Sequence, residues 1–115
     1  MAKLPNYHHG NLREQILQTA FNLLDDEGVE SIGIRKIARM LKVAHSAPAN
    51  HFKNKQALLT ALAAASFRHL VAEIETESVN HVGNLRAAIH AFSSTILQYG
   101  LSFPNRYKLL WRREY

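Results

Sequence analysis

The sequence contains no cysteine, which excludes disulfide bonds, cysteine-ligated zinc and thiol nucleophiles. It also has no uninterrupted apolar run near the roughly 18 residues that a membrane span requires, so we expect a soluble protein with no membrane contact. The first ten residues, MAKLPNYHHG, lack the apolar core and the small-residue cleavage site of a signal peptide. A cytoplasmic location is therefore expected.

Acidic residues are absent between Glu30 and Glu73. The lysines and arginines inside the same window are Arg35, Lys36, Arg39, Lys42, Lys53, Lys55 and Arg68. A merely solvated surface would normally mix charges of both signs, whereas a field of one sign attracts polyanions. The net charge of +5 has the same sign. This distribution favours a nucleic-acid partner over a plain solvated surface.

Patterns typical of catalysis or metal binding are also missing. No serine stands in a Gly-x-Ser-x-Gly context, and no glycine-rich loop could cradle a phosphate. The seven histidines include no pair spaced as His-x3-His, and no carboxylates cluster beside them. We therefore expect a protein that is not an enzyme and that holds no cofactor and no metal.

Apolar residues recur at helical spacing along the chain and never alternate as in strands, which predicts an all-α fold. The first helix is expected over 11–27, with Asn11 and Glu14 as a capping box and Gly28 as a left-handed terminator. Shorter helices are expected over 34–41 and 45–51. A long helix capped by Asn54, an amphipathic helix from Leu85 and a last helix opened by Pro104 complete the prediction. A chain of 115 residues is long enough for one domain, or for one small domain plus part of another.

The two short helices cannot bury enough apolar surface alone, so they must pack on the helices that flank them. That arrangement describes a helix-turn-helix unit over about 33–52, with Ala38 where the helices cross and Phe52 in a small core. The second short helix of such a unit enters the DNA major groove, and its first residues, here His45 and Ser46, meet base edges. A corner of a helical bundle with no nucleic-acid role is the alternative.

The stretches YHHGNLREQIL, GVESIGIRKIARMLKV and APANHFKNKQALL together resemble the N-terminal DNA-binding domain of TetR/AcrR family transcriptional regulators. The resemblance runs without a gap from Tyr7 to about Ile74. It implies a three-helix DNA-binding domain over 7–70, followed by a long connecting helix. Residues 71–115 then correspond to the start of a helical ligand-binding and dimerisation domain, which is incomplete here.

The resemblance also implies roles for individual residues. Positions that read or approach bases in this family correspond to Arg35, His45, Ser46, Ala47 and Asn50, and those that hold phosphate correspond to His51 and Lys55. His8 and His9 belong to an N-terminal arm near the DNA backbone. Lys55 also makes physical sense, because the N-terminus of a helix favours an anion. Asn50 has two interpretations, an adenine contact or a solvated surface residue.

Several residues depart from the family pattern. Gly33 stands where a phosphate-binding threonine is usual, and Lys42 stands where glycine is usual in the turn. Ala44 replaces the usual Ser or Thr cap of the second short helix. Ala49 replaces a tyrosine that bonds a phosphate in the family. We therefore expect weaker binding to the DNA backbone than the family pattern alone would imply.

The function implied is a sequence-specific DNA-binding transcriptional regulator, a repressor that a small-molecule ligand releases from DNA. Its partners would be double-stranded DNA, an effector whose binding residues are unknown, and a second copy of the chain if the dimerisation helices are present. The alternative is a truncated helical module for protein interaction or heterodimerisation, with weak or nonspecific DNA binding. In a truncated chain we expect an exposed apolar patch made of Phe92, Ile96, Tyr99, Leu109, Leu110 and Trp111.

Overall fold

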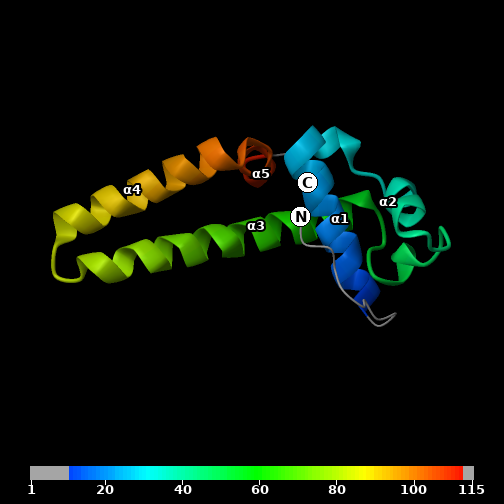
Figure 1. The fold of residues 1–115 in the computed structure, drawn as a ribbon, viewed down its shortest axis with the longest axis horizontal. Coiled ribbons are helices and arrows are strands. Elements are labelled where there is room, and N and C mark those ends of the chain that lie inside the picture. The colour runs from blue at the N-terminus through cyan, green and yellow to red at the C-terminus, as the bar shows by residue number, and fades with distance from the viewer. Residues whose placement is uncertain (1–10, 113–115) are drawn as a thin grey trace. The chain divides into compact units, whose positions relative to one another are not determined.

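The computed structural model describes residues 11–112, and every regular element in that range is helical. In chain order the elements are α1 (Leu12–Glu27), η2 (Val29–Ser31), α2 (Ile34–Leu41), η3 (Pro48–Asn50), α3 (Lys55–Ser78), η4 (Val79–His81), α4 (Leu85–Ser102) and α5 (Pro104–Leu110), where η marks a 3₁₀ turn (Figure 1). The predicted all-α class is confirmed. The predicted histidine arm at His8 and His9 lies outside the described residues.

The chain divides into two compact units, 1–59 and 60–115. The division falls inside α3, so the last residues of the first unit and the first residues of the second belong to one helix. The domain boundary that the sequence predicts near residue 70 falls inside this helix as well, and it stays a prediction.

In the first unit, α1 is amphipathic and buries Ile16, Ala20 and Leu24 against the elements that follow it. Gly28 ends the helix as predicted, and its N–H donates to the carbonyl oxygens of Leu23 and Leu24. Its backbone has φ 97° and ψ 176°, an extended conformation of positive φ that only glycine adopts readily, rather than the left-handed helical one. The predicted capping box at the other end is wrong, because the Asn11 side chain makes no capping hydrogen bond.

Helix α2 has the predicted bounds, Ile34–Leu41. Ile37 and Ala38 are fully buried, whereas Arg35 and Arg39 are exposed. A methyl group at position 38 lets α2 approach its neighbours closely, and α1 and α2 pack on each other in this unit. The small apolar core predicted for the helix-turn-helix unit is therefore present, with Phe52 only 3% exposed.

The segment after α2, residues 43–52, is called the recognition segment here. The predicted α-helix over 45–51 is wrong, because only Pro48–Asn50 is regular and it forms a 3₁₀ turn. Hydrogen bonds between residues three apart run through it, from the Ala47 N–H to the Ala44 oxygen and on to the His51 N–H and the Pro48 oxygen. Proline has no N–H and its ring crowds the carbonyl four residues earlier, so Pro48 disfavours α-helical bonding in the middle of the segment.

In the second unit, α3 and α4 run side by side in opposite directions, joined through η4 (Figure 1). Both helices begin at an asparagine cap: the Asn54 side chain accepts from the Ala57 N–H at 2.9 Å, and Asn84 accepts from the Ala87 N–H at 3.1 Å. The cap predicted at Asn54 is thus confirmed. In the loop between the two helices, Gly83 has a φ of 87°, a conformation that β-carbon-bearing residues rarely adopt.

A polar and aromatic cluster holds α3, α4 and α5 together in this unit. The Tyr99 hydroxyl donates to the Ser66 carbonyl oxygen at 3.1 Å, and the Arg106 guanidinium lies 3.0 Å from Nδ1 of His69. Arg106 also stacks over the Phe103 ring, 4.0 Å from its centroid. These contacts fix the short helix α5, which has too few residues to be stable alone.

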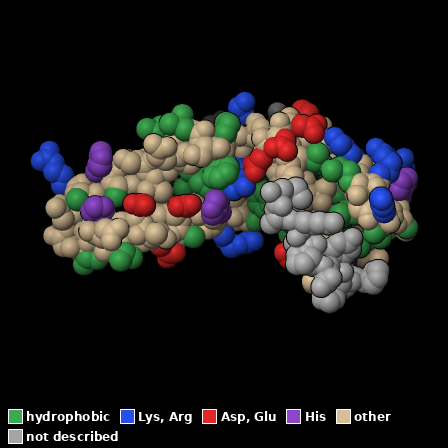
Figure 2. Space-filling view, in the orientation of Figure 1, with side chains coloured by type: hydrophobic (Ala, Val, Ile, Leu, Met, Phe, Trp, Pro, Cys, Tyr) green, Lys and Arg blue, Asp and Glu red, His purple; other side chains and the backbone are tan. Residues whose placement is uncertain are grey.

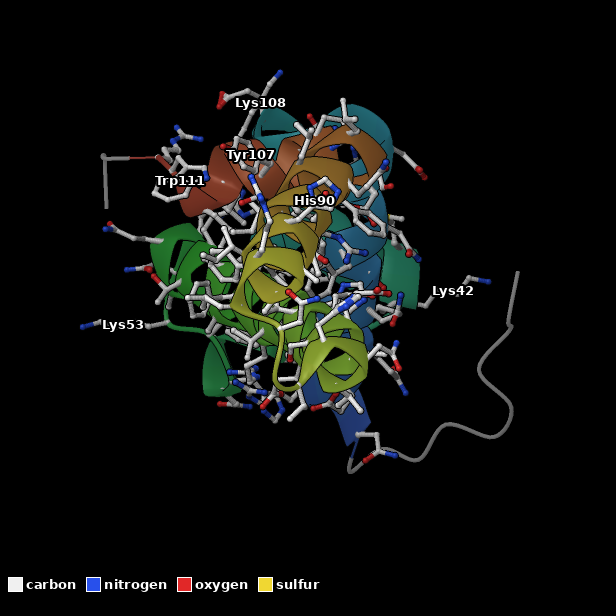
Figure 3. The ribbon with its side chains drawn as sticks, turned by 90° about the vertical axis from the view of Figure 1, so that its left-hand side faces the viewer. Lys42, Lys53, His90, Tyr107, Lys108 and Trp111 are labelled. Carbon is white, nitrogen blue, oxygen red and sulfur yellow. The ribbon has the colours of Figure 1, made fainter. Side chains whose placement is uncertain are left out.

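The apolar patch predicted on the last two helices is present in part. Phe92 and Trp111 are 50% and 68% exposed, as predicted, but Tyr99 and Leu109 are buried at 4% and 0%. Tyr99 is buried because its hydroxyl finds a backbone partner on α3, so it does not depend on later residues for cover. Trp111 stands on the outside beside Tyr107, with 6.0 Å between the ring centroids (Figure 3).

Ser66 on α3 is a polar residue in the buried part of the second unit. Its side chain is fully buried, and its hydroxyl has no hydrogen-bond partner among the described residues. A buried hydroxyl without a partner carries a desolvation cost of about 1–3 kcal/mol. We expect Ser66→Ala to raise the free energy of unfolding by about 1 kcal/mol, measured by urea titration with far-UV circular dichroism. Ser93→Ala, at an exposed position, is the matched control, and a loss of stability in Ser66→Ala would contradict this assignment.

The stretch Lys55–His81 is long and apolar enough to cross a membrane by length and composition alone, and 28% of its apolar window is buried. One such helix is weak evidence for a membrane span, since helices of soluble proteins pass the same test. A search for uninterrupted apolar runs misses this stretch, because Thr60, Ser66 and Arg68 interrupt a sequence that is apolar on average. The expected lack of membrane contact therefore stays a prediction.

Candidate nucleic-acid interface

The turn between α2 and the recognition segment has a defined backbone geometry. Lys42 adopts a left-handed conformation, with φ 58° and ψ 43°. Its N–H donates to the Arg39 oxygen at 3.1 Å, and the Val43 N–H donates to the Ala38 oxygen at 3.0 Å. This pair of bonds is a Schellman motif, in which glycine usually holds the left-handed position. Lysine there costs on the order of 1 kcal/mol, so the turn is strained.

Two buried residues fix the recognition segment while its polar side chains face outward. Pro48 and Phe52 are buried, and the Phe52 N–H donates to the Pro48 oxygen at 2.9 Å. The Arg13 guanidinium of α1 covers the Phe52 ring at 5.1 Å from its centroid, a cation–π contact. The segment is therefore held against the core at its middle and at its end.

The residues predicted for DNA contact all lie in the first unit, on three consecutive elements. Arg35 is on α2, Lys55 is the first residue of α3, and the others belong to the recognition segment. Exposed side chains are those of Arg35, His45, Ser46, Asn50, His51 and Lys55, and Ala47 is half-buried. These exposures leave the predicted positions accessible to a partner, and their roles stay predictions.

The same unit carries the cationic surface. Figure 2 shows Lys and Arg side chains gathered at the end that bears α2 and the recognition segment. Lys36 is a correction to this picture, because its Nζ lies 3.7 Å from Oε1 of Glu27 and part of its charge is neutralised there. In the described part of the chain, no ion-pair partner accompanies the exposed cations Arg35, Arg39, Lys42, Lys53 and Lys55.

Ala49 and Gly33, two of the residues that depart from the family pattern, lie at the surface of the recognition segment and just before α2. Ala49 is exposed next to Asn50, so a methyl group stands on the outer side of the recognition segment where a phosphate-binding hydroxyl was expected. Gly33 precedes α2 in an extended conformation and offers no side chain to the helix N-terminus. Arg13 was not identified from the sequence, and its only signal there would have been its place on the first turn of α1, near the interface.

The second unit contains an open groove of about 490 Å³ between α3 and α4. Its lining includes Glu73, Glu77, His81, His90, Tyr99 and Phe103. One of these carboxylates, Glu73, is 3.5 Å from Nε2 of His69. Among residues 11–112, no three side chains of His, Asp or Glu come together as metal ligands would. The groove could take a small molecule in contact with both helices.

Residues 16–62 match the family described as bacterial regulatory proteins, tetR family. The chain is similar to the tetracycline repressor protein class C of Escherichia coli, with 49% identity over 53 residues that cover 46% of this chain and 24% of that protein. It is also similar to the tetracycline repressor protein class A from transposon 1721 of Escherichia coli, with 42% identity over 64 residues that cover 56% of this chain and 28% of that protein. The chain thus spans about a quarter of the length of these curated relatives.

A solved structure extends the similarity beyond the matched domain. A protein of unknown function from Rhodococcus sp. RHA1 superposes with a TM-score of 0.81 and 33% sequence identity, over 94% of this chain and 56% of that one. Similarity at this level covers both compact units. The helical second unit is therefore part of the shared fold, although the family match itself ends at residue 62.

Proposed function

We propose that this member of the tetR family of bacterial regulatory proteins, which carries the family's N-terminal domain at residues 16–62, binds double-stranded DNA and regulates transcription. The observation that carries the proposal is the surface of the first unit. Pro48 and Phe52 fix its recognition segment, and the polar side chains of that segment are exposed. In the described part of the chain, no ion-pair partner accompanies the nearby cations Arg35, Arg39, Lys42, Lys53 and Lys55. A surface of this kind fits a polyanion with a groove.

The proposed contacts follow from the chemistry of the exposed side chains. Arg35 could bind guanine through its O6 and N7 acceptors, and Asn50 could bind adenine through N6 and N7. Lys55 and His51 would hold phosphates, which fix the register of the protein without reading sequence. Because the recognition segment is a 3₁₀ turn and not a full helix, few of its side chains can reach bases, and we expect moderate sequence preference.

The repressor role, dimerisation and ligand release belong to the same proposal. Two copies of the chain would bind the two halves of a pseudo-palindrome, as symmetric helix-turn-helix dimers do. A small molecule in the groove between α3 and α4 would change the DNA affinity. The groove supports this part of the proposal because it lies on α3, the helix that begins with Lys55.

A helical module for protein interaction is the second candidate function, and one observation favours it. Helix α4 carries a single Lys, Arg, Asp or Glu residue, Arg86, while its apolar side chains Ile89, Phe92, Leu97 and Leu101 are at least half exposed. Exposed apolar surface of this kind is typical of protein contacts. In this alternative, the first unit would bind DNA weakly and without sequence preference.

The proposal is tested by fluorescence anisotropy with two labelled duplexes, one from the region upstream of the gene and one of shuffled sequence. A regulator should prefer the upstream duplex, and log K should fall linearly with log salt by about 0.9 for each phosphate neutralised. Equal affinity for both duplexes would favour a nonspecific DNA binder. No binding to either duplex at about 50 mM salt would overturn the proposal and leave the interaction module.

A further inference from the structure

The strained backbone at Lys42 is not compensated by any packing or ion-pair contact of its side chain in the described part of the chain. Lys42 is the one non-glycine residue of positive φ between residues 11 and 112, and its side chain is exposed. Glycine would make the same Schellman hydrogen bonds without strain. A lysine side chain at this point neither packs in the core nor forms an ion pair in the described part of the chain. Strained backbone that persists without a packing reason points to a role for the side chain itself.

A second lysine stands at the other end of the recognition segment. Lys53 follows the buried Phe52 directly, and it too is exposed without an ion-pair partner in the described range. Figure 3 shows Lys42 and Lys53 projecting outward on opposite sides of the ribbon. The recognition segment is thus bracketed by two cations that point away from each other.

Both lysines leave the backbone at fixed points. The Schellman bonds from the N–H groups of Lys42 and Val43 hold one end of the segment, and the burial of Phe52 holds the other. Fixed attachment matters because a lysine on a mobile loop would lose more conformational entropy on binding an anion. The spacing between these points therefore cannot adapt much to the ligand.

We propose that Lys42 and Lys53 bind phosphates of the two DNA strands that border the groove entered by the recognition segment. The inference rests on the proposed function. The major groove is about 12 Å wide and lined by a phosphate backbone on each side, which matches two cations on opposite sides of one inserted segment. Such contacts fix the position of the segment in the groove and carry no sequence information. They would offset the phosphate contacts expected to be missing at Ala49 and Gly33.

The experiment uses the full chain and a fluorescein-labelled duplex of mixed sequence, with anisotropy read between about 50 and 200 mM NaCl. The variants are Lys42→Gln, Lys53→Gln and the double variant, and Lys108→Gln on α5 of the second unit is the charge-matched control. Each single variant should make the fall of log K with log salt shallower by about 0.9, and the double variant should make it shallower by about twice that. Between the lowest and the highest salt concentration, the affinity of each single variant should fall by a factor about 3.5 times smaller than the factor by which the affinity of the unmodified chain falls. Lys108→Gln should leave the slope unchanged.

Lys42→Gly separates a binding role from a structural one. Removal of the strain should raise the midpoint of thermal unfolding by about 4 °C, while the slope falls as in Lys42→Gln. If Lys42 had only a structural role, Lys42→Gly would raise the stability and leave the salt dependence of binding unchanged.

Two results would overturn the inference, and they are distinguishable. If the unmodified chain binds the duplex but both single variants keep its slope, the lysines do not bind phosphate and the proposed function still stands. If the unmodified chain does not bind at about 50 mM salt, the proposed function fails and the inference fails with it.

Discussion

Replacement of Phe52 with alanine is expected to lower the free energy of unfolding by about 3–5 kcal/mol, the largest effect of any single substitution considered for the first unit. The ring is 3% exposed, it ends the recognition segment, and the Arg13 guanidinium covers it at 5.1 Å. Truncation would remove the buried ring, leave a cavity and leave Arg13 without its aromatic partner. Urea titration followed by far-UV circular dichroism measures the change.

Two variants control this experiment. Phe52→Leu keeps most of the apolar volume and should cost less than about 1.5 kcal/mol. Phe67→Ala removes the same atoms from a position that is 57% exposed, and it should change stability by no more than about 0.5 kcal/mol. A similar loss for Phe52→Ala and Phe67→Ala would mean that Phe52 does not anchor the segment. A large loss confined to Phe52→Ala would support its role at the end of the recognition segment.

Lys55→Glu is expected to weaken DNA binding on the order of tenfold at about 100 mM salt while it makes the fold more stable. The substitution removes one phosphate-binding cation and places an anion in its position. The same anion sits at the N-terminus of α3, whose first turn contains no acidic residue, so it should add about 0.5 kcal/mol through the helix dipole. Fluorescence anisotropy measures the expected loss of DNA affinity, and thermal unfolding of the same preparation measures the expected gain of stability.

Lys108→Glu on α5 makes the same change of net charge outside the first unit. If Lys55 holds a phosphate, Lys108→Glu should weaken binding much less than Lys55→Glu does, because Lys108 belongs to the second unit and all the predicted DNA contacts belong to the first. Equal loss in the two variants would show that net charge alone governs the affinity. The assignment of Lys55 as a phosphate contact would then be wrong.

Local patterns in the sequence predicted much of the first unit. The apolar residues of α2 recur at helical spacing and its arginines fall between them, so both the bounds and the buried face of this helix follow from period and polarity. The strained conformation of Lys42 was also predictable, because a helix that ends in a Schellman motif needs a left-handed residue whether or not glycine is there to supply it. The start of α3 was predictable from Asn54, a good N-cap residue that stands before a long stretch of apolar residues at helical spacing.

The recognition segment was harder to predict, because its length favours a short α-helix while its proline disfavours one. His45 to Phe52 has the length of a short helix, but Pro48 disfavours α-helical bonding in its centre, and periodicity does not register the loss of one N–H. Tyr99 was misplaced for another reason. Its burial depends on the Ser66 carbonyl, 33 positions earlier in the chain, and no local pattern encodes a contact of that range.

The candidate site divides in the same way. Exposure of Arg35, Asn50 and Lys55 follows from their charged or polar side chains, so a surface of these residues was predictable. Their roles in DNA binding stay predictions. The cover of Phe52 by Arg13 and the ion pair of Lys36 with Glu27 were not predictable, because each joins residues of different elements whose packing had first to be known.

The exposure of Trp111 decides which optical signals can follow this protein. It is the sole tryptophan of the chain, it lies in the second unit, and it is 68% exposed. Its emission should already be close to that of indole in water, so unfolding should shift the spectrum little and loss of the first unit should leave it unchanged. Far-UV circular dichroism is therefore the better signal for following unfolding. A blue shift of the emission would instead report that a second molecule has covered this end of α5, and it would do so without any added label.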